Sequence, residues 1–452
     1  MTRWLFAIAV ASVVASCKNR DIPYKPPKQD AAAVVADAGE VIDAAVATTK
    51  LGATKVAVGE NFSCAVLTDK TLRCWGRNNE GQLGTGTMTD SPAPVAPKLV
   101  GVIDVVVGTA HACALLDDRS VTCWGRINYG HAENLLLPTG VAGVAKVKRL
   151  FAVRRASCAT LDDGELVCWG DVDLQGHLRL PGSTIEHRVP TPVEGLSKVA
   201  MLTVNGALHE DGTVSFWGAD GVPEKTALTG VSEIASSGEE VCGLREDGSV
   251  ACVGPTTVCA ANAPKPPVKK APAKAPAKKA PAKKTATKTT KKTAKKPAPK
   301  KPEPKKPEPK PEPAPPKEQP IEVLALPPAK HLAFDVGLCV VTKTGALQCL
   351  AARDGCKQDS PWPGLANLDR VNGFCALARD GAVKCWDVDR KSRLVSAIAE
   401  ATNVRDLVVS STHACALRSD HEIVCWGSNK FGALGRVEID EDPHREARPV
   451  VF

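Results

Sequence analysis

The sequence is poor in features that mark several large classes of proteins. Aromatic residues make up only 4% of the 452 residues, against 36 Gly and 35 Pro, which disfavours a helical bundle. Beyond residue 15, no apolar stretch is long enough to cross a membrane as a helix. The Gly-x-Ser-x-Gly, His-Glu-x-x-His and phosphate-loop motifs of common catalytic sites are absent. We therefore predict a protein that is not an enzyme and that uses no cofactor and no metal.

The amino terminus is typical of an export signal. Residues 1–16 carry one positive charge, Arg3, followed by an apolar stretch that is too short for a stable transmembrane helix. The stretch ends in Val14-Ala15-Ser16-Cys17, which resembles the lipobox of bacterial lipoproteins. The resemblance implies cleavage before Cys17 and acylation of its thiol and new amino group. A plain secretory signal, with an incidental Cys17, is the alternative.

The residues after Cys17 predict where the protein is anchored. Several acyl chains give stable membrane anchoring without a transmembrane helix. Lys18 stands where, by analogy with Gram-negative lipoproteins, an Asp retains the protein at the inner membrane. We therefore expect a lipid-anchored cell-envelope protein at the outer membrane of a Gram-negative bacterium. Residues 17–52, rich in Ala, Asp and Pro, predict a flexible tether.

Most of the remaining chain is an internal repeat built on the pattern Cys-x9-Cys-Trp-Gly. Each unit alternates apolar and polar residues on both sides of a turn rich in Asp and Gly, which predicts a β-hairpin, and a further apolar run adds another strand. Three to four short strands per unit are typical of a propeller blade. The Asp and Gly residues favour turn chemistry over a calcium site. Eight units are found, at residues 58–76, 107–125, 153–170, 204–218, 236–254, 334–351, 370–387 and 410–427.

Two segments point to a known family. The sequence from Trp75 to Gly86, WGRNNEGQLGTG, resembles the signature of regulator of chromosome condensation repeats, and WGSNKFGALG from Trp426 to Gly435 resembles it too. The resemblance covers residues 53–262 (repeats 1–5) and 321–452 (repeats 6–8), and implies an all-β propeller with one repeat per blade. Seven or eight blades remain open, because the family form usually has seven and units four to seven are shorter. We expect the Trp residues to pack between blades rather than form a ligand cage.

The cysteines indicate disulfides within the hairpins. Seventeen Cys are too many for a reduced cytosolic chain. Fourteen of them form seven pairs separated by ten positions, and the fourth unit lacks both members, with Gly206 and Phe216 instead. Joint loss favours a bonded pair, and residues opposed across a hairpin lie within disulfide reach. Zinc is the rival, but it prefers closer Cys spacing. The predicted pairs are Cys64/Cys74, Cys113/Cys123, Cys158/Cys168, Cys242/Cys252, Cys339/Cys349, Cys375/Cys385 and Cys415/Cys425.

Two further cysteines occupy equivalent positions in adjacent units. Cys259 follows Cys252 by seven residues, and Cys356 follows Cys349 by seven residues. We predict that Cys259 and Cys356 form a disulfide with each other. Two histidines, His111 and His413, also recur at one repeat position, two residues before the first Cys, and we expect them to be structural.

A basic insertion, residues 263–320, separates repeats five and six. It contains 19 Lys and 4 Glu, a balance of +15, so the rest of the chain carries −7 against the total of +8. It also holds 17 of the 35 Pro and, Pro aside, only one apolar residue larger than Ala, which predicts disorder. It resembles the tails of linker-histone-like proteins, and DNA condensation is one interpretation. We favour contact with an anionic envelope polymer, since an exported protein rarely meets chromosomal DNA and no aromatic or Arg residues interleave.

Taken together, these features predict a cell-envelope lipoprotein whose propeller loops bind a protein partner or act as a scaffold. Two alternatives remain open. One is an inhibitor or receptor, because a secreted β-lactamase inhibitor protein shares this repeat class. The other is a scaffold that binds polyanions or DNA through the insertion, although a nucleic-acid partner is disfavoured.

Overall fold

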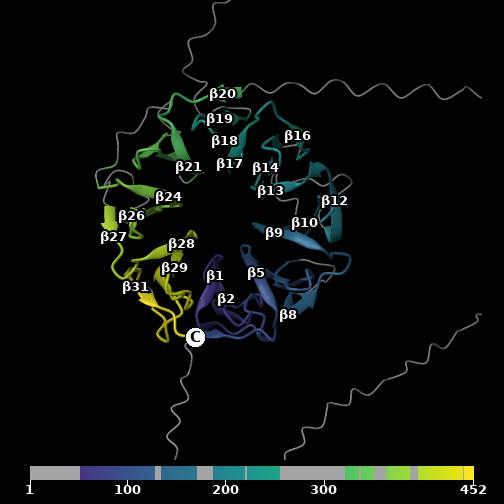
Figure 1. The fold of residues 1–452 in the computed structure, drawn as a ribbon. Coiled ribbons are helices and arrows are strands. Elements are labelled where there is room, and N and C mark those ends of the chain that lie inside the picture. Colours follow the sequence, from purple (N-terminus) through teal and green to yellow (C-terminus); the bar gives the residue numbers. More distant parts are fainter. Residues whose placement is uncertain are drawn as a thin grey trace, which may run out of the picture. The chain divides into compact units, whose positions relative to one another are not determined.

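The computed structural model describes residues 51–127, 134–170, 187–218, 221–254, 321–334, 337–350, 362, 364–386, 395–440 and 442–452. These residues form eight antiparallel sheets and no helix, within one compact unit, Lys50–Phe452. The sheets follow one another around a central axis in chain order, from the purple blade to the yellow one (Figure 1). Each sheet is one propeller blade, so the structure has eight blades.

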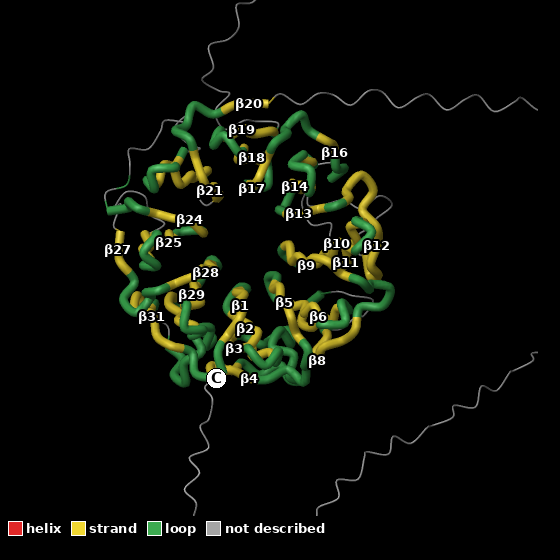
Figure 2. Tube along the Cα trace, viewed as in Figure 1, coloured by secondary structure: helices red, strands yellow, loops and turns green. Residues whose placement is uncertain are grey.

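The strands of each blade are consecutive in the chain, and the first strand of each blade lies nearest the axis (Figure 2). Blades 1 to 4 comprise β1 Ala53–Val58, β2 Phe62–Leu67, β3 Leu72–Gly76, β4 Ser91–Val95; β5 Val102–Val107, β6 His111–Leu116, β7 Val121–Gly125, β8 Leu135–Gly140; β9 Val147–Val153, β10 Ala156–Leu161, β11 Glu165–Gly170, β12 His187–Ser197; and β13 Val199–Leu202, β14 Gly206–His209, β15 Val214–Phe216, β16 Glu224–Lys225. Blades 5 to 8 comprise β17 Val231–Ser236, β18 Val241–Arg245, β19 Val250–Val253, β20 Ile321–Val323; β21 Ala329–Phe334, β22 Leu338–Thr342, β23 Leu347–Cys349; β24 Leu368–Asn372, β25 Cys375–Ala378, β26 Val383–Trp386, β27 Val395–Ala397; and β28 Val404–Val409, β29 His413–Arg418, β30 Ile423–Gly427, β31 His444–Pro449.

The hydrophobic core lies between the blades. The buried side chains gather in eight clusters, and each cluster joins two neighbouring blades. One of them closes the ring, because Val56 and Trp75 of blade 1 pack with Leu417 and Leu434 of blade 8. No strand is exchanged between the first and last blades among the described residues. Side-chain packing and hydrogen bonds therefore carry the closure.

The hairpin between the second and third strands of each blade has a tightly specified turn. In seven blades an Asp carboxylate accepts a hydrogen bond from the backbone N–H two residues later, as Asp69 does from Thr71 at 3.0 Å. Hydrogen bonding from Thr71 lowers the pKa of Asp69, because the bonds favour the charged carboxylate. These carboxylates thus hold their own turns. The described residues contain no group of three or more acidic, His or Cys side chains that could hold a metal.

The same turns join each blade to the next. The residue after the Asp, or its equivalent, has a positive φ of 61–91°, and its carbonyl accepts a backbone N–H at the start of the next blade. Val102 N–H, for example, donates to Lys70 O at 2.9 Å, and Ala53 N–H donates to His421 O at 2.7 Å across the ring closure. We call the side of the ring that carries these turns the tip face. The inner strands begin at the tip face and end at the opposite side, the loop face.

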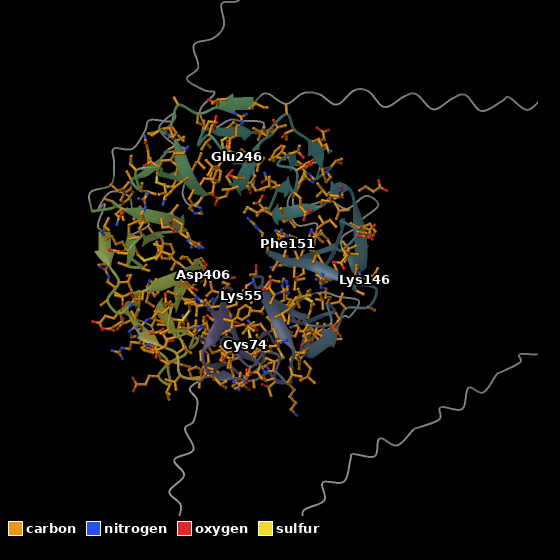
Figure 3. The ribbon with its side chains drawn as sticks, viewed as in Figure 1. Lys55, Cys74, Lys146, Phe151, Glu246 and Asp406 are labelled. Atoms are coloured by element: carbon orange, nitrogen blue, oxygen red, sulfur yellow. A yellow bond between two sulfur atoms is a disulfide. The ribbon has the colours of Figure 1, made fainter. Side chains whose placement is uncertain are left out.

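Seven of the eight hairpins contain a disulfide that joins the second strand to the third. The bonded cysteines are direct register partners ten residues apart, with Cα atoms 4.0–4.1 Å apart, and all are buried. Such close spacing is typical of pairs whose backbones do not hydrogen-bond to each other. The bonds are Cys64–Cys74, Cys113–Cys123, Cys158–Cys168, Cys242–Cys252, Cys339–Cys349, Cys375–Cys385 and Cys415–Cys425. Figure 3 labels Cys74 within blade 1.

The hairpin of blade 4 has no disulfide at this register. Gly206 pairs with Phe216 where the other blades pair two cysteines. A Cβ on Gly206 would lie 2.6 Å from Val241 Cγ2 of blade 5, while the Phe216 ring is buried in the interface with that blade. Packing between blades thus replaces the covalent bond in this hairpin.

The signature loops lock neighbouring blades together. Asn78, fully buried, accepts from Leu83 N–H at 2.9 Å and donates to the Thr87 and Thr89 carbonyls, which shapes the loop of blade 1. The Gln82 carbonyl of this loop accepts the indole N–H of Trp124 of blade 2 at 2.8 Å. The equivalent loop of blade 8 accepts Trp75 of blade 1 through Ala433 O, also at 2.8 Å. Trp side chains therefore pack between blades.

The basic insertion falls within blade 5. It lies between β19 and β20, which are paired, with Val253 opposite Ile321 and Cys252 opposite Glu322. The third strand of a blade ends at the loop face, so Gly254 and Ile321, the described residues on either side of the insertion, lie there. The insertion thus occupies the position of an ordinary strand connection.

Deleting residues 263–320 and joining the ends with a short Gly/Ser segment is expected to preserve the propeller. The pairing of β19 with β20 uses only residues that the deletion keeps. Thermal unfolding of the two proteins at equal ionic strength checks this, and an unchanged melting temperature is the expected result. A large drop would mean that the insertion packs against the blades.

Five sequence predictions lie outside the described residues. They are the export signal at 1–16, the lipidation of Cys17, the tether at 17–52 apart from its last two residues, the pairing of Cys259 with Cys356, and the disorder of 263–320. The described residues contain no helix that is long and apolar enough to cross a membrane.

Candidate functional site: the axial belt and cavity

The inner strands carry a ring of charges around the axis. The third residue of each inner strand forms this ring, which we call the axial belt. Its members are Lys55, Asp104, Arg149, Met201, Glu233, His331, Arg370 and Asp406. Figure 3 labels Lys55 and Asp406 at the inner edge of neighbouring blades. Positive and negative side chains alternate around most of the ring.

Ion pairs between neighbouring strands use this alternation. Lys55 of blade 1 pairs with Asp104 of blade 2. Arg370 of blade 7 lies 3.7 Å from the Asp406 carboxylate of blade 8. The side chains of these pairs are 27–42% exposed, so each contributes at most about 1 kcal/mol to stability. The belt therefore contributes little to the stability of the ring.

His331 joins three blades at the belt. Its Nδ1 lies 2.7 Å from Glu233 Oε1 of blade 5, and its Nε2 lies 2.8 Å from Val371 O of blade 7. Both partners are acceptors, and only the doubly protonated imidazole can donate from both nitrogens. Burial of the ring opposes the charged form, but hydrogen bonding and the charge of Glu233 outweigh it and raise the pKa of His331.

The belt is interrupted between blades 3 and 5. Met201 takes the place of a charged residue in blade 4, so Arg149 has no carboxylate in the next blade at belt level. Arg149 instead donates to Ala200 O at 3.1 Å. The belt itself therefore has no ion pair here among the described residues, whereas Lys148 pairs with Glu210 of blade 4 at 2.6 Å outside the belt.

A cavity of about 430 Å³ opens on the axis beside this interruption. The ends of the inner strands of blades 3 to 7 line it, so it lies at the loop face. Its wall combines apolar side chains, such as Leu202, Val204 and Phe334, with polar ones, such as Thr203 and Asn372. Ala152 and Ser236 are small at a strand position where blades 1, 2 and 8 carry Val, and this difference leaves the space.

The two recurring histidines lie away from the cavity. His111 Nε2 shares a hydrogen bond with Ser157 Oγ of the next blade at 2.9 Å, and His413 Nε2 shares one with Ser63 Oγ at 2.8 Å. Burial lowers the pKa of each to about 4, so both are neutral at pH 7. Their place between blades makes them structural residues, in agreement with the prediction.

The repeat pattern did not predict the belt or the cavity. The partners in the belt come from different repeats; Lys55 and Asp104, for example, are 49 positions apart. A column-by-column alignment of the third residue in each apolar run would have revealed the alternating charge. The cavity depends on side-chain size at one further column, which the cysteine pattern does not report.

Comparison with known proteins identifies the repeat. A family model of the regulator of chromosome condensation (RCC1) repeat matches residues 53–82, 102–130 and 404–433, and a second model of this repeat matches residues 73–115. These segments belong to blades 1, 2 and 8, which form the ring closure and its neighbour. No curated protein matches the chain.

Solved structures share the architecture at low sequence identity. Prp20p from Saccharomyces cerevisiae is 16% identical with a TM-score of 0.50, and the match covers 88% of this chain and 87% of Prp20p. Human WBSCR16 is 15% identical with a TM-score of 0.50, and the match covers 84% of this chain and 94% of WBSCR16. At these identities the likeness concerns the fold alone. The chain is therefore an eight-bladed propeller, and its blades 1, 2 and 8 match the regulator of chromosome condensation (RCC1) repeat.

Proposed function

We propose that this protein is an exported lipoprotein whose propeller holds a protein partner at the loop face. The observation that carries the proposal is the set of seven buried disulfides, one in each of seven hairpins. Structural disulfides persist in oxidising compartments and are rare in the cytosol. The apolar amino terminus ending at Cys17 supplies a route to such a compartment and a thiol for lipid attachment.

The binding role rests on the fold and on the form of the loop face. Propellers of this repeat type are binding or scaffold modules in general, and Prp20p was studied for its binding to Gsp1p and histones. Loops held by a rigid scaffold are common binding surfaces. In this chain the loop face combines an axial cavity with the described residues that flank the basic insertion.

A second candidate function is contact with an anionic envelope polymer through residues 263–320. The observation that favours it is the charge of +15 in that segment against −7 in the remainder. Binding of this kind weakens steeply with salt, because it releases counterions. Affinity capture from envelope extracts with and without 263–320 separates the two functions. A partner that the deletion variant retains is bound by the propeller, whereas a salt-sensitive partner that it loses is bound by the insertion.

Replacing Cys17 by Ser is expected to release the protein from membranes or leave it unprocessed. Without the thiol there is no site for lipid attachment, and no described helix can replace the anchor. Fractionation of cells with and without detergent, combined with mass measurement of the amino terminus, tests the result. Cys259→Ser serves as a control with another cysteine removed. Normal cleavage with unchanged membrane fractionation of Cys17→Ser would refute the lipid anchor.

A further inference from the structure

The axial cavity has a one-sided charge. Its sixteen described lining residues include two cationic side chains, Arg154 and His331, and no Asp or Glu. The charge of His331 is matched by Glu233, which lies 2.7 Å away behind the wall. Arg154 is exposed and forms no ion pair with the described residues. Among the described residues, the positive charge of Arg154 at the rim therefore has no matching carboxylate.

The wall of the cavity also offers an unused hydrogen-bonding group. Ser236 Oγ is buried and has no hydrogen-bond partner among the described residues. Leaving a buried hydroxyl unpaired costs about 1–3 kcal/mol, so a molecule that pairs with Ser236 removes this cost. Around Ser236 the wall is apolar, formed by side chains such as Ile234, Val204 and Phe334.

The size of the cavity limits what it can hold. A volume of about 430 Å³ is near the lower end of the range of about 300–1,000 Å³ for ligand pockets, and it suits one or two side chains of a protein. The apolar side chains of the wall favour an apolar group, and the Arg154 guanidinium favours an anion at the rim. A group that has an apolar part and an anionic part can contact both the apolar side chains of the wall and the Arg154 guanidinium.

We propose that the cavity binds an apolar side chain that is flanked by a carboxylate, presented by a loop or chain end of the protein partner. This proposal rests on the proposed function, since it names the chemistry of the partner at the same face. The apolar side chain enters between the ends of β13, β17 and β21. Its neighbouring carboxylate lies at Arg154, and the Ser236 hydroxyl, which is buried in the free protein, turns toward the cavity to pair with a polar atom of the segment.

Two fluorescent probes separate the apolar requirement from the anionic one. 1-Anilinonaphthalene-8-sulfonate is an apolar anion, and N-phenyl-1-naphthylamine has nearly the same rings without the charge. The folded protein is expected to bind one equivalent of the anionic probe more tightly than the neutral one. Arg154→Gln should lower the affinity for the anionic probe by about tenfold or more, because a charge-assisted contact is lost. The affinity for the neutral probe should stay unchanged. Equal affinities of the two probes, or no effect of Arg154→Gln, would overturn the proposal.

A filled cavity and a matched control complete the test. Ser236→Phe places a ring in the cavity, and Phe334 of blade 6 shows that a phenylalanine fits at this register. Val58→Phe adds the same ring at this register in blade 1, where it does not line the cavity. Ser236→Phe should abolish binding of both probes, and Val58→Phe should preserve it, at unchanged melting temperatures. Retained one-to-one binding by Ser236→Phe would contradict the assignment.

The partner itself distinguishes this proposal from the proposed function. A partner captured by the wild-type protein and by Val58→Phe should be lost with Ser236→Phe and weakened by Arg154→Gln. If it binds all variants equally, the partner uses another surface, so the cavity proposal fails while the proposed function stands. If the probes behave as expected but no protein partner binds the wild-type propeller, the proposed function fails and so does the assignment of the cavity to a protein segment.

Discussion

Loss of the seven hairpin disulfides is expected to lower the melting temperature of the propeller by about 20 °C. Each bond closes a loop of about ten residues and contributes about 2–3 kcal/mol through restriction of the unfolded chain. Seven such contributions sum to roughly 14–21 kcal/mol. With an unfolding entropy of about 2.1 cal/mol/K per residue, the lower end of this sum corresponds to the stated shift. Coupling between blades makes the sum an upper bound.

The comparison is between the oxidised protein and the same protein refolded with its thiols reduced and blocked from reoxidation. Thermal unfolding of both forms, followed by circular dichroism, gives the difference. Breaking one bond by Cys113→Ala and Cys123→Ala together should cost little more than either change alone, since each removes the same bond. Equal melting temperatures for the reduced and oxidised forms would show that the bonds do not stabilise the blades.

Acidification from pH 7 to pH 4.5 is expected to destabilise the propeller through His111 and His413. Both are completely buried, and burial lowers their pKa to about 4, whereas the unfolded chain has the usual value near 6.5. Between these two pKa values the unfolded state binds protons that the folded state does not bind. The free energy of unfolding therefore falls as the pH drops through this range. Each histidine costs about 3 kcal/mol once the pH is below both values.

Urea unfolding at pH 7.0 and 4.5 measures this loss, and the double variant His111→Gln with His413→Gln should remove most of it. Glutamine keeps a hydrogen-bonding group for Ser157 and Ser63 but does not titrate. His331 acts in the opposite sense, because its raised pKa adds stability at low pH that is lost as the pH rises through the folded-state value. An undiminished acid loss in the double variant would rule out these two histidines as its cause.

The local structure of the blades was predictable from the repeat. Alternation around an Asp/Gly turn fixes the hairpin, and the separation of ten residues places Cys64 opposite Cys74. The joint loss at Gly206 and Phe216 is explained by the same register, since these two residues face each other. These features are local, so the sequence of one repeat unit is nearly sufficient to predict them.

The number of blades and the candidate site were not predictable in this way. Eight blades close because each interface between neighbouring blades buries its own cluster, including the one between blades 8 and 1. The belt pair of Glu233 with His331 and the space beside Ser236 arise where strands from different repeats meet. A single unit contains no signal for such contacts. These contacts can be found only when the position of every blade around the axis is known.

The sequence differences among blades correlate with their roles in the ring. Blades 1 and 8 retain the signature loop and hold the closure through Trp75 and Ala433. Blade 4 lacks the disulfide, carries Met201 in the belt and lines the cavity. The departures from the repeat thus gather near the candidate site, where a binding function would favour variation over uniform packing.

Peptide mapping under non-reducing conditions, on protein isolated from the cell envelope, tests the central claim most directly. An exported, disulfide-bonded propeller predicts seven linked peptide pairs, each joining a Cys to the one ten residues later, and an acylated amino-terminal peptide beginning at Cys17. The same map should show Cys259 linked to Cys356. Free thiols at the fourteen hairpin positions in protein alkylated before lysis would contradict both the compartment and the function built on it.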